Sequence, residues 1–569
     1  MKKLLGILIS LVLACACIGG AGCSSSSGSS GSSGNNSGSS GGGDTPAAVK
    51  VYPVSYSEVN ERTDMEEFFD ETLDVAGRNT VSHDGKLDYG FVKSVWHEIT
   101  VNGVNVPVYS ARCGKGVHSF AWADVGASGD FTVTAEVTYK GTDSKNSVTI
   151  LPEKSGVKAT LSGKKATAKI SGYGSYTFVY DGAPEQSVTL YLAPESKPQV
   201  PAGYETVTLQ PGEYTAEQTN FKNGNTFYLF KAGVYDVTSI NLPSDSIIYF
   251  ERGCYLRAYE SGESDYLSVF SGSGSNSKIL GRAIVDFSKC MGGEAKTKGA
   301  YSFTGVQNFE LEGLISVNSN NWTMCVTLGN DVKVSRCMFF SYRTFSDGIM
   351  FSDCKNATAT DCFIRTGDDA AEVKAFSQSA AEDCYTENVL FENNCVWTDK
   401  GIAYGCIYES RHDVKGVTFR NNSVGFAQAS WSEHLGCITM QMGSDKNAIW
   451  ENAVFENMEI YQTSCATVSI YNNAKTEVEG GTIRKIYVRG VTVKKAVKTN
   501  LPVYMLSVVM LTGDGVTTSN VKVGAVYLDD INYCGTLIDS DNYLEYSNFN
   551  IGEGITFSKN NIKINTRDE

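Results

Sequence analysis

Two short stretches of the sequence place acidic residues beside glycine. The stretch "IRTGDDAAEVKA", residues 364–375, contains the adjacent acids Asp368 and Asp369. The similar phrase "FSDGIMF" places Asp347 before Gly348, 21 residues before Asp368. Asp and Gly build turns, so three unrelated turn caps are one interpretation. A shared carboxylate cluster is the other, because neighbouring acids raise the pKa of at least one of them and so provide an acid catalyst.

The elements that position these acids repeat along the chain. Phrases such as "VQNFELEGLISVNS", "GNDVKVSRCMFFSY" and "CKNATATDCFIRTG" each combine a polar turn, a short alternating strand, a second turn and an apolar run. Their period of about 20 to 35 residues is typical of stacked repeats. No amphipathic helical stretch lies between them, which argues against βαβ units. Stacked coils of strands bury one continuous core, so residues 199–569 are expected to form a right-handed parallel β-helix, the catalytic domain.

Cysteines recur within these phrases. Cys337, Cys362 and Cys395 fall at the same point of "SRCMFF", "TDCFIR" and "NNCVWT", which predicts an internal stack of small buried side chains. One sulfur per coil without a nearby histidine gives no tetrahedral zinc site. Thirteen cysteines follow Cys23, without a CxxC pair, so no dense disulfide framework is indicated, and whether any of them pair stays open.

Strand register decides whether the acids meet. Neighbouring coils of a β-helix stack about 4.8 Å apart. If "DGIMF" pairs with "DAAEV", Asp347 lies beside Asp369, and Asp368 occupies the preceding turn. The pairing would place one set of side chains in the core, namely Ile349, Phe351, Ala371 and Val373. It would place a second set on the outer face beside the acids, namely Met350, Glu372 and Lys374.

Such a patch suits glycoside hydrolysis with inversion. One protonated acid donates to the leaving oxygen, and a carboxylate about 6.5–9.5 Å away activates water. Spacing alone does not choose between this chemistry and separate turn caps.

The amino-acid sequences of the motifs also resemble those of a known family. "NSNNWT", "SDG" and "GDDAAEVKA", in this order on a β-helix, resemble the glycoside hydrolases of the polygalacturonase and dextranase clan, families 28 and 49. A preceding β-sandwich, Lys374 after "GDD" and the phrase "YFERGCYLRA" look most like family 49, the dextranases and isopullulanases. The resemblance covers residues from about 50 to 480. It implies that Asp368 is the general acid and that Asp347 and Asp369 position and deprotonate the water.

The sequence departs from polygalacturonases. Their Gly-His-Gly and Arg-x-Lys phrases have no convincing match, and the following coil reads "YGCIYESRH". The net charge of −15 also disfavours polyanionic ligands, nucleic acid and anionic membrane surfaces. We therefore expect a polysaccharide hydrolase acting on a neutral α-glucan such as dextran. The alternatives are a polygalacturonase-like pectin hydrolase, a polysaccharide lyase or epimerase, for which calcium is often required, and a non-catalytic glycan-binding β-helix.

Several side chains are candidates for binding the substrate. A cation at Lys374 could lower the pKa of a neighbouring carboxylate or bind sugar hydroxyls, although a solvated lysine is equally compatible with the pattern. Glu409 and Arg411 follow one coil on and could instead form a surface ion pair. A loop tryptophan such as Trp431 can stack on a sugar or pack over the helix edge. The full set is Lys374, Glu372, Glu409, Arg411, Trp431 and His434.

Metal and triad chemistry are not indicated. The five histidines are scattered, so neither a metal site nor a Ser-His-Asp arrangement is suggested. The proposed mechanism needs no cofactor. Trp322 is expected to pack within its coil.

The N-terminal region reads as an export and tethering segment. Residues 1–22, followed by Cys23, resemble a lipoprotein signal in which Cys23 is lipidated, with Cys15 and Cys17 as alternatives and plain secretion as the other possibility. The Ser/Gly-rich residues 23–48 form a tether. Alternating strands and Asn-Gly or Asp-Gly turns over residues 49–198 predict a β-sandwich. We expect an extracellular monomer, secreted or held on a bacterial cell surface by its lipid.

Overall fold

The regular secondary structure of the described residues is almost entirely β-strand in the computed structural model, as expected for an all-β protein. Residues 46–569 form one compact unit. No helix in the described part of the chain is long and apolar enough to cross a membrane. The predicted signal segment, Cys23 and almost all of the tether lie outside the described residues. The described residues are 47–51, 91–113, 116–126, 130–184, 187–259, 268–290, 299–319, 321–343, 345–377, 384–429, 432–443, 448–472, 481–498, 507–513, 521–549 and 555–566.

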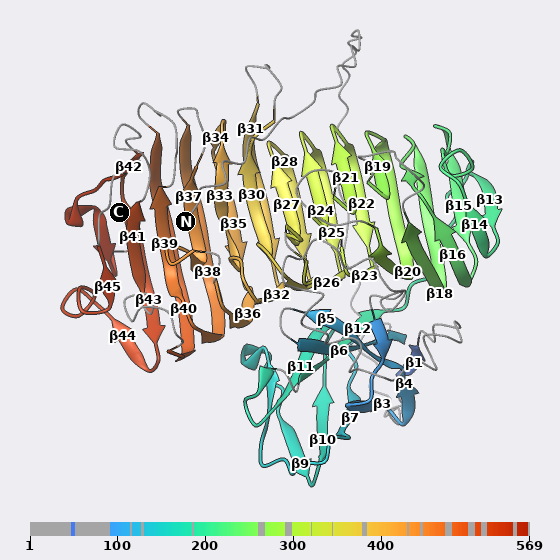
Figure 1. The fold of residues 1–569 in the computed structure, drawn as a ribbon, viewed down its shortest axis with the longest axis horizontal. Helices are drawn as coiled ribbons and strands as arrows, with labels where there is room; N and C mark the ends of the chain where they lie inside the picture. The colour runs from blue at the N-terminus through green and yellow to red at the C-terminus, as the bar shows by residue number, and fades with distance from the viewer. Residues whose placement is uncertain are drawn as a thin grey trace, which may run out of the picture. The chain divides into compact units, whose positions relative to one another are not determined.

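Two sheets precede the repeats (Figure 1). In the five-stranded sheet, β7 alternates buried and partly exposed residues, which is the pattern of a half-buried sheet, whereas β5 and β12 of the seven-stranded sheet are buried almost throughout. Residues of both sheets, including Val101, Val137 and Phe178, share one apolar core. The seven-stranded sheet contains β1 (Ala48–Val51), β2 (Phe91–Lys93), β5 (Val108–Cys113), β6 (Gly116–Gly126), β8 (Val148–Leu151), β11 (Gly174–Tyr180) and β12 (Ser187–Pro194). The five-stranded sheet contains β3 (His97–Val101), β4 (Val104–Val106), β7 (Val133–Tyr139), β9 (Ala159–Ser162) and β10 (Lys165–Ile170).

The repeats form a right-handed parallel β-helix, and each central coil has three strands. Every strand pairs with its counterpart in the next coil, so the coils form three rows of strands (Figure 1). The first row contains β13 (Glu205–Leu209), β15 (Thr226–Phe230), β22 (Gln307–Glu312), β25 (Asn330–Ser335), β28 (Lys355–Thr360), β31 (Tyr385–Glu392), β34 (Asp413–Val414), β35 (Val417–Arg420), β42 (Val521–Val523), β43 (Val526–Tyr533), β46 (Ile555–Thr556) and β47 (Ile562–Ile564). The second row contains β14 (Gly212–Tyr214), β16 (Gly233–Val237), β23 (Ile315–Val317), β26 (Met338–Phe340), β29 (Phe363–Thr366), β32 (Cys395–Thr398) and β36 (Ser423–Ala427).

Four long strands and β43 run through both of these rows, and a short strand folds back antiparallel on β43. The long strands are β18 (Ser246–Tyr259), β20 (Ser275–Lys289), β38 (Ile449–Thr463) and β40 (Thr482–Ala496), and the short one is β44 (Thr536–Ile538).

The third row is a separate parallel sheet, and the predicted acids lie in the turns that enter it. This row contains β17 (Ile240–Asn241), β19 (Phe270–Gly272), β21 (Tyr301–Thr304), β24 (Met324–Thr327), β27 (Ile349–Ser352), β30 (Ala371–Ala375), β33 (Tyr404–Ser410), β37 (Gly436–Met442), β39 (Ala466–Asn472), β41 (Val509–Gly513) and β45 (Ser547–Asn548). Asp347 precedes β27, and Asp368 and Asp369 precede β30. The turns from the second row to the third therefore carry the acids on adjacent coils.

Stacked side chains fill the interior of the β-helix. The rings of Phe391, Phe419 and Phe455, one from each of three successive coils, are nearly parallel, with centroids 4.9 and 4.8 Å apart. This spacing is that of neighbouring strands, so each coil buries its ring against the next.

The predicted cysteine stack is wrong in its third member. Cys337 and Cys362 occupy equivalent core positions, but Cys395 pairs with Phe363 and so lies one residue out of step. The position next to Cys362 is taken by Asn394, whose Oδ1 accepts the Cys362 backbone N–H at 2.9 Å. The turns before Phe363 and Cys395 have the same length, so the strand register makes Asn394, and not Cys395, the equivalent of Cys362. The thirteen cysteines of the described residues are all free thiols.

The sandwich packs against the second row of the β-helix. The Arg365 guanidinium bonds Asp399 at 3.0 and 3.2 Å and contacts Nδ1 of His118 at 2.9 Å. Phe120 of the sandwich stacks on Phe340 of the β-helix at 4.6 Å. These contacts hold the two sheet systems together on the strands that lead into the acid-bearing turns.

Candidate active site

The pairing of β27 with β30 brings the acids together. Ile349 pairs with Ala371 and Met350 with Glu372, which confirms the predicted register. The Gly348 N–H donates to the carbonyl of Asp369 at 2.7 Å, so the two acid-bearing turns are bonded directly to each other. Asp347 consequently lies alongside Asp369, with Asp368 one residue earlier in the turn.

Glycine permits this close approach of the turns. A Cβ at Gly348 would lie 2.1 Å from the Ala370 carbonyl oxygen. A Cβ at Gly401, in the next coil, would lie 2.4 Å from the backbone of Asp368 and Asp369. Both distances are shorter than any real contact, so a side chain at either position would push the acid-bearing turns apart.

Asp368 is held by backbone donors. Its carboxylate accepts the N–H groups of Phe345 and Asp369, each at 3.1 Å. Phe345 has a φ of +62°, a conformation that bulky residues rarely adopt, and this turn directs its N–H at Asp368. The side chain is only 9% exposed. Burial, followed by the charges of Asp347 and Asp369, raises the pKa of Asp368 well above its usual value.

Three further carboxyl groups converge beside it. Asp347, Asp369 and Glu372 each present an oxygen within 4.8 Å of the other two. Oδ1 of Asp369 accepts the Ile402 N–H at 2.8 Å. Burial and then the charge of Asp347 raise the pKa of Asp369 to about 7.

Glu372 is the most enclosed of these acids. Its side chain is fully buried, and neither carboxylate oxygen has a hydrogen-bond partner. Burial is the main cause that raises its pKa well above the ordinary range, and Asp347 and Asp369 add to the effect. Glu372 therefore lies on the outer face of the sheet, as predicted, but inside a covered site.

Lys374 is the cation at the centre of the cluster. Its Nζ lies 3.2 Å from Asp347, 3.5 Å from Glu372 and 3.4 Å from Glu409. Desolvation opposes its charge, but the surrounding carboxylates outweigh that cost and raise its pKa well above normal. The acids could in principle hold a metal ion, yet the ammonium group already supplies positive charge at this position.

A β-bulge in β33 aims Glu409 at Lys374. The pairing of β30 with β33 shifts between Val373–Cys406 and Ala375–Ser410. Within the bulge, Tyr408 has a φ of +57° and a 42% exposed side chain. Glu409 consequently contacts Lys374, so it belongs to the site. Arg411 directly follows β33, and its backbone N–H donates to the Ala375 carbonyl at 2.7 Å.

His434 lies farther along the same row of turns and faces away from the acids. Its ring stacks on Tyr471 at 4.7 Å, and its Nδ1 bonds the Thr512 hydroxyl at 2.8 Å. Both partners belong to later coils. Trp431 lies outside the described residues, as does the predicted lipidation residue, Cys23.

Two residues of the site escaped the sequence reasoning. Trp322 was expected to pack within its coil, but its ring lies 4.7 Å from the ammonium of Lys374. A register argument would have found it, because Trp322 precedes β24 just as Asp347 precedes β27. No sequence pattern pointed to Phe345, because its role depends on a backbone conformation.

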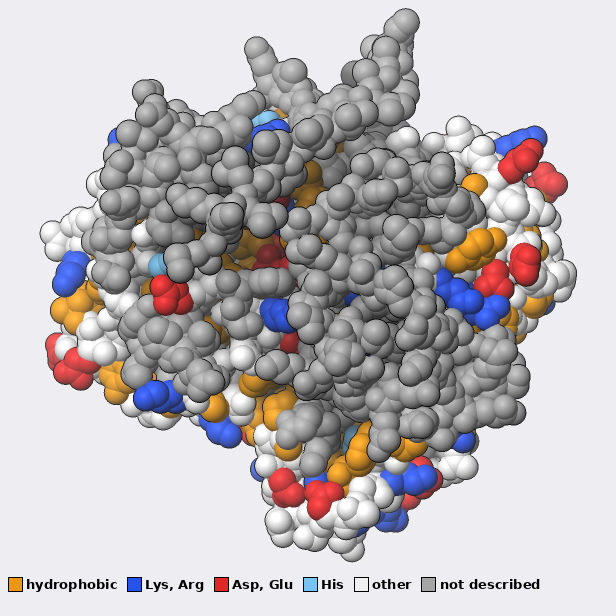
Figure 2. All heavy atoms as spheres, viewed as in Figure 1, with side chains coloured by type: hydrophobic (Ala, Val, Ile, Leu, Met, Phe, Trp, Pro, Cys, Tyr) orange, Lys and Arg blue, Asp and Glu red, His pale blue; other side chains and the backbone are white. Residues whose placement is uncertain are grey.

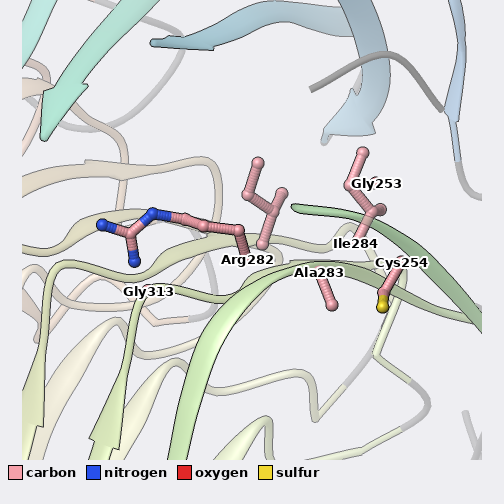
Figure 3. A pocket seen from close by; sticks show the side chains of 7 residues that line it. Gly253, Cys254, Arg282, Ala283, Ile284 and Gly313 are labelled. Atoms are coloured by element: carbon pink, nitrogen blue, oxygen red, sulfur yellow. The ribbon is translucent and has the colours of Figure 1, made fainter. Parts of the chain in front are cut away.

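A small pocket elsewhere does not include these groups. It is lined by residues of β18, β20 and β23 and the turn before β23, and by none of the acids (Figure 3). On the face seen in Figure 2, acidic and basic side chains are mixed over the visible described surface. The acid cluster is therefore recognised by the buried contacts among its own residues, and not by a pocket or a charged surface patch.

Comparison with known proteins gives one family match. The family model for glycosyl hydrolases family 28 matches residues 275–544, which contain all of the acids. No curated protein matches the chain.

Several solved structures are similar to the chain. An exopolygalacturonase from Thermotoga maritima is 14% identical with a TM-score of 0.45, over 60% of this chain and 94% of its own. A family 28 exopolygalacturonase from Yersinia enterocolitica is 12% identical with a TM-score of 0.40, over 76% and 96% of the two chains. The catalytic unit of a family 87 α-1,3-glucanase from Streptomyces thermodiastaticus is 11% identical with a TM-score of 0.35, over 83% of each chain. The family match supports a glycoside hydrolase of the polygalacturonase clan, whereas the expected preference for family 49 is not confirmed.

Proposed function

We propose that the protein hydrolyses O-glycosidic bonds of an extracellular polysaccharide with inversion at the anomeric carbon. The observation that carries the proposal is the pairing of β27 with β30, which gathers Asp347, Asp368 and Asp369 around one position. An acid that remains protonated near neutral pH can donate to a leaving sugar oxygen. Carboxylates held beside it can position and deprotonate a water molecule.

The roles of the three acids follow from their surroundings. Asp368 is the general acid, because its raised pKa keeps it protonated. Asp347 and Asp369 act on the water, and the Lys374 ammonium near them helps to retain negative charge on at least one of the two. The Trp322 ring, 4.7 Å from the Lys374 ammonium, adds an aromatic side chain to the same site.

A neutral α-glucan, with dextran as the first test substrate, is the proposed substrate class. Lys374 is already shared by three carboxyl groups, those of Asp347, Glu372 and Glu409. A uronate carboxylate placed beside this cluster would meet several acids, and like charges at such short range repel. The net charge of −15 also favours a neutral substrate over a polyanionic one.

Polygalacturonate is the second candidate, and the family 28 match is the observation that favours it. A calcium-dependent lyase would release an unsaturated product, and a non-catalytic glycan-binding protein would release none. Export, followed by lipidation at Cys23 or plain secretion, remains the proposed setting for either substrate, with the protein acting as a monomer.

One experiment separates these possibilities. The purified chain is incubated with dextran, other neutral α-glucans and polygalacturonate, and new reducing ends are counted against Asp368→Asn. Faster release from a neutral glucan supports the proposal, while faster release from polygalacturonate assigns the second candidate. Proton NMR of the first product then reports the anomer, and initial retention of the substrate's anomeric form would contradict inversion.

A further inference from the structure

A second group of ligand-type side chains lies at the opposite ends of the acid-bearing strands. Asp353, Cys384 and His412 present an oxygen, a sulfur and a nitrogen atom within 4.8 Å of one another. Asp353 directly follows β27, Cys384 directly precedes β31 and His412 directly precedes β34. These three positions belong to successive coils, so one corner of the β-helix collects one ligand from each.

The pairing of the strands explains why the corner is shared. Tyr385 pairs with Asp413, so the preceding residues, Cys384 and His412, occupy equivalent positions of neighbouring coils. Asp353 occupies the corner of the coil before them, with a φ of +52° that turns the chain from β27 into β28. Each turn therefore contributes its side chain at the same edge of the stack.

The Asp353 carboxylate is held in a fixed orientation. Its Oδ2 accepts the Ser377 N–H at 2.7 Å and the Ser352 hydroxyl at 3.1 Å. Its Oδ1 lies 2.9 Å from Nδ1 of His412. The Asp353 side chain is fully buried and that of His412 is 14% exposed. Hydrogen bonds that fix one carboxylate oxygen and leave the other directed at a shared centre are characteristic of supported metal ligands.

The three donor types match one group of metals. Zn²⁺ binds thiolate sulfur, imidazole nitrogen and carboxylate oxygen in tetrahedral geometry, with bonds of about 2.0–2.3 Å. In tetrahedral geometry, these bond lengths place two ligand atoms about 3.3–3.8 Å apart. The three ligand atoms already lie within 4.8 Å of one another, and the His412–Asp353 hydrogen bond would give way to two metal bonds.

Protonation of the thiol sets the condition for binding. Burial, with the nearby charge of Asp353, raises the pKa of Cys384 to about 11. The thiol is therefore protonated without metal, and binding must release that proton to solvent as the sulfur–metal bond forms. A histidine and a carboxylate already placed at the centre favour this exchange, because each contributes a ligand without further chain movement.

We propose that Asp353, Cys384 and His412 form a three-ligand site for Zn²⁺ or a related divalent transition metal, with water in the fourth position. The metal would join the turns that follow β27, β30 and β33, and these strands also carry the Asp347, Asp368–Asp369 and Glu409 positions. It would thereby stabilise the stack of the three acid-bearing coils, because a ligand that binds only the folded state adds to its stability. No sequence motif pointed to this site, because each coil supplies a single ligand.

Cobalt substitution tests the site directly. The full chain, purified without a polyhistidine tag and stripped with a chelator, is titrated with Co²⁺ and separately with Zn²⁺. The expected results are one metal ion per chain, the visible absorption bands of tetrahedral Co²⁺, a thiolate-to-metal charge-transfer band, and a rise in Tm that excess chelator reverses. Cys384→Ser and His412→Gln should each weaken binding at least tenfold, and Cys384→Ser should abolish the charge-transfer band.

The matched control is Cys534→Ser, which removes an exposed thiol remote from the cluster and should leave all four readouts unchanged. Equal metal binding by wild type and both cluster variants would overturn the proposal, as would binding without a thiolate band. If Cys384→Ser does not fold, His412→Gln provides the same comparison, because a glutamine amide can still hydrogen-bond Asp353.

Discussion

The Nζ of Lys374 lies 3.2 Å from Oδ2 of Asp347, and both side chains are almost excluded from water, at 6% and 3% exposure. The pair joins neighbouring coils, because Lys374 pairs with Ser352 at the end of β27 and Asp347 lies in the turn before the same strand. A buried charge pair of this kind costs much free energy to break, because removal of one partner leaves the other uncompensated. Lys374 therefore ties the electrostatics of the site to the stability of the β-helix.

Replacing Lys374 by methionine should destabilise the protein by about 3–5 kcal/mol near pH 7, the usual cost of an uncompensated buried charge. The loss should shrink at pH 4–5, because Asp369, with a pKa of about 7, is protonated there and no longer needs a counter-ion. Thermal unfolding of Lys374→Met and wild type at both pH values measures the difference. An equal loss of stability at the two pH values would show that Lys374 contributes only packing.

Replacing Asp368 by asparagine should leave the fold intact and lower the rate by a factor on the order of 10² to 10⁴, the usual contribution of a positioned acid. Asp347→Asn and Asp369→Asn should do comparable harm, and any two together should cost less than the product of their separate effects. The matched control is Asp331→Asn, an exposed aspartate near the start of β25 with a φ of +54° that asparagine tolerates. Melting temperature and rate are measured on the same samples. Near-normal turnover in Asp368→Asn would remove it from the role of acid.

The sequence was most informative where strand periodicity governs the structure. Alternation at Ile349 and Phe351 predicted both the core face and the pairing with Ala371 and Val373, because a one-residue slip would expose every apolar side chain. It was least informative where turns vary in length or conformation. The bulge that brings Glu409 to Lys374 and the left-handed turn at Phe345 depend on backbone geometry that no local pattern encodes.

The stability of the protein should depend on pH through Asp369. Its folded pKa of about 7 lies above the value of about 3.9 expected when unfolded. The unfolded state therefore binds fewer protons between these values, so this group's favourable contribution is present below about pH 4 and is lost as pH rises through 7. Asp369→Asn should match wild type near pH 4 and become progressively more stable than wild type up to pH 8. A stability difference that does not change with pH would contradict this prediction.

The pH dependence of kcat/KM should respond in opposite directions to two neighbouring substitutions. The ascending limb reports ionisation of the water-activating pair in the free enzyme, and Asp369 places it near pH 7. Lys374 lowers the pKa of Asp369 whereas Glu409 raises it, so the two residues act on the same carboxyl with opposite signs. Lys374→Met should move the limb to higher pH by about one unit or more, and Glu409→Gln should move it to lower pH.

The comparison of these two variants is more informative than either alone. Loss of packing or of a substrate contact would lower kcat/KM at every pH without separating the two profiles, whereas an electrostatic effect requires the limbs to move apart. The measurement is kcat/KM across pH 4–9 for wild type and both variants on the substrate that releases reducing ends fastest. If the ascending limbs of the two variants coincide or move in the same direction, the ionisation of Asp369 does not determine the ascending limb of the kcat/KM profile.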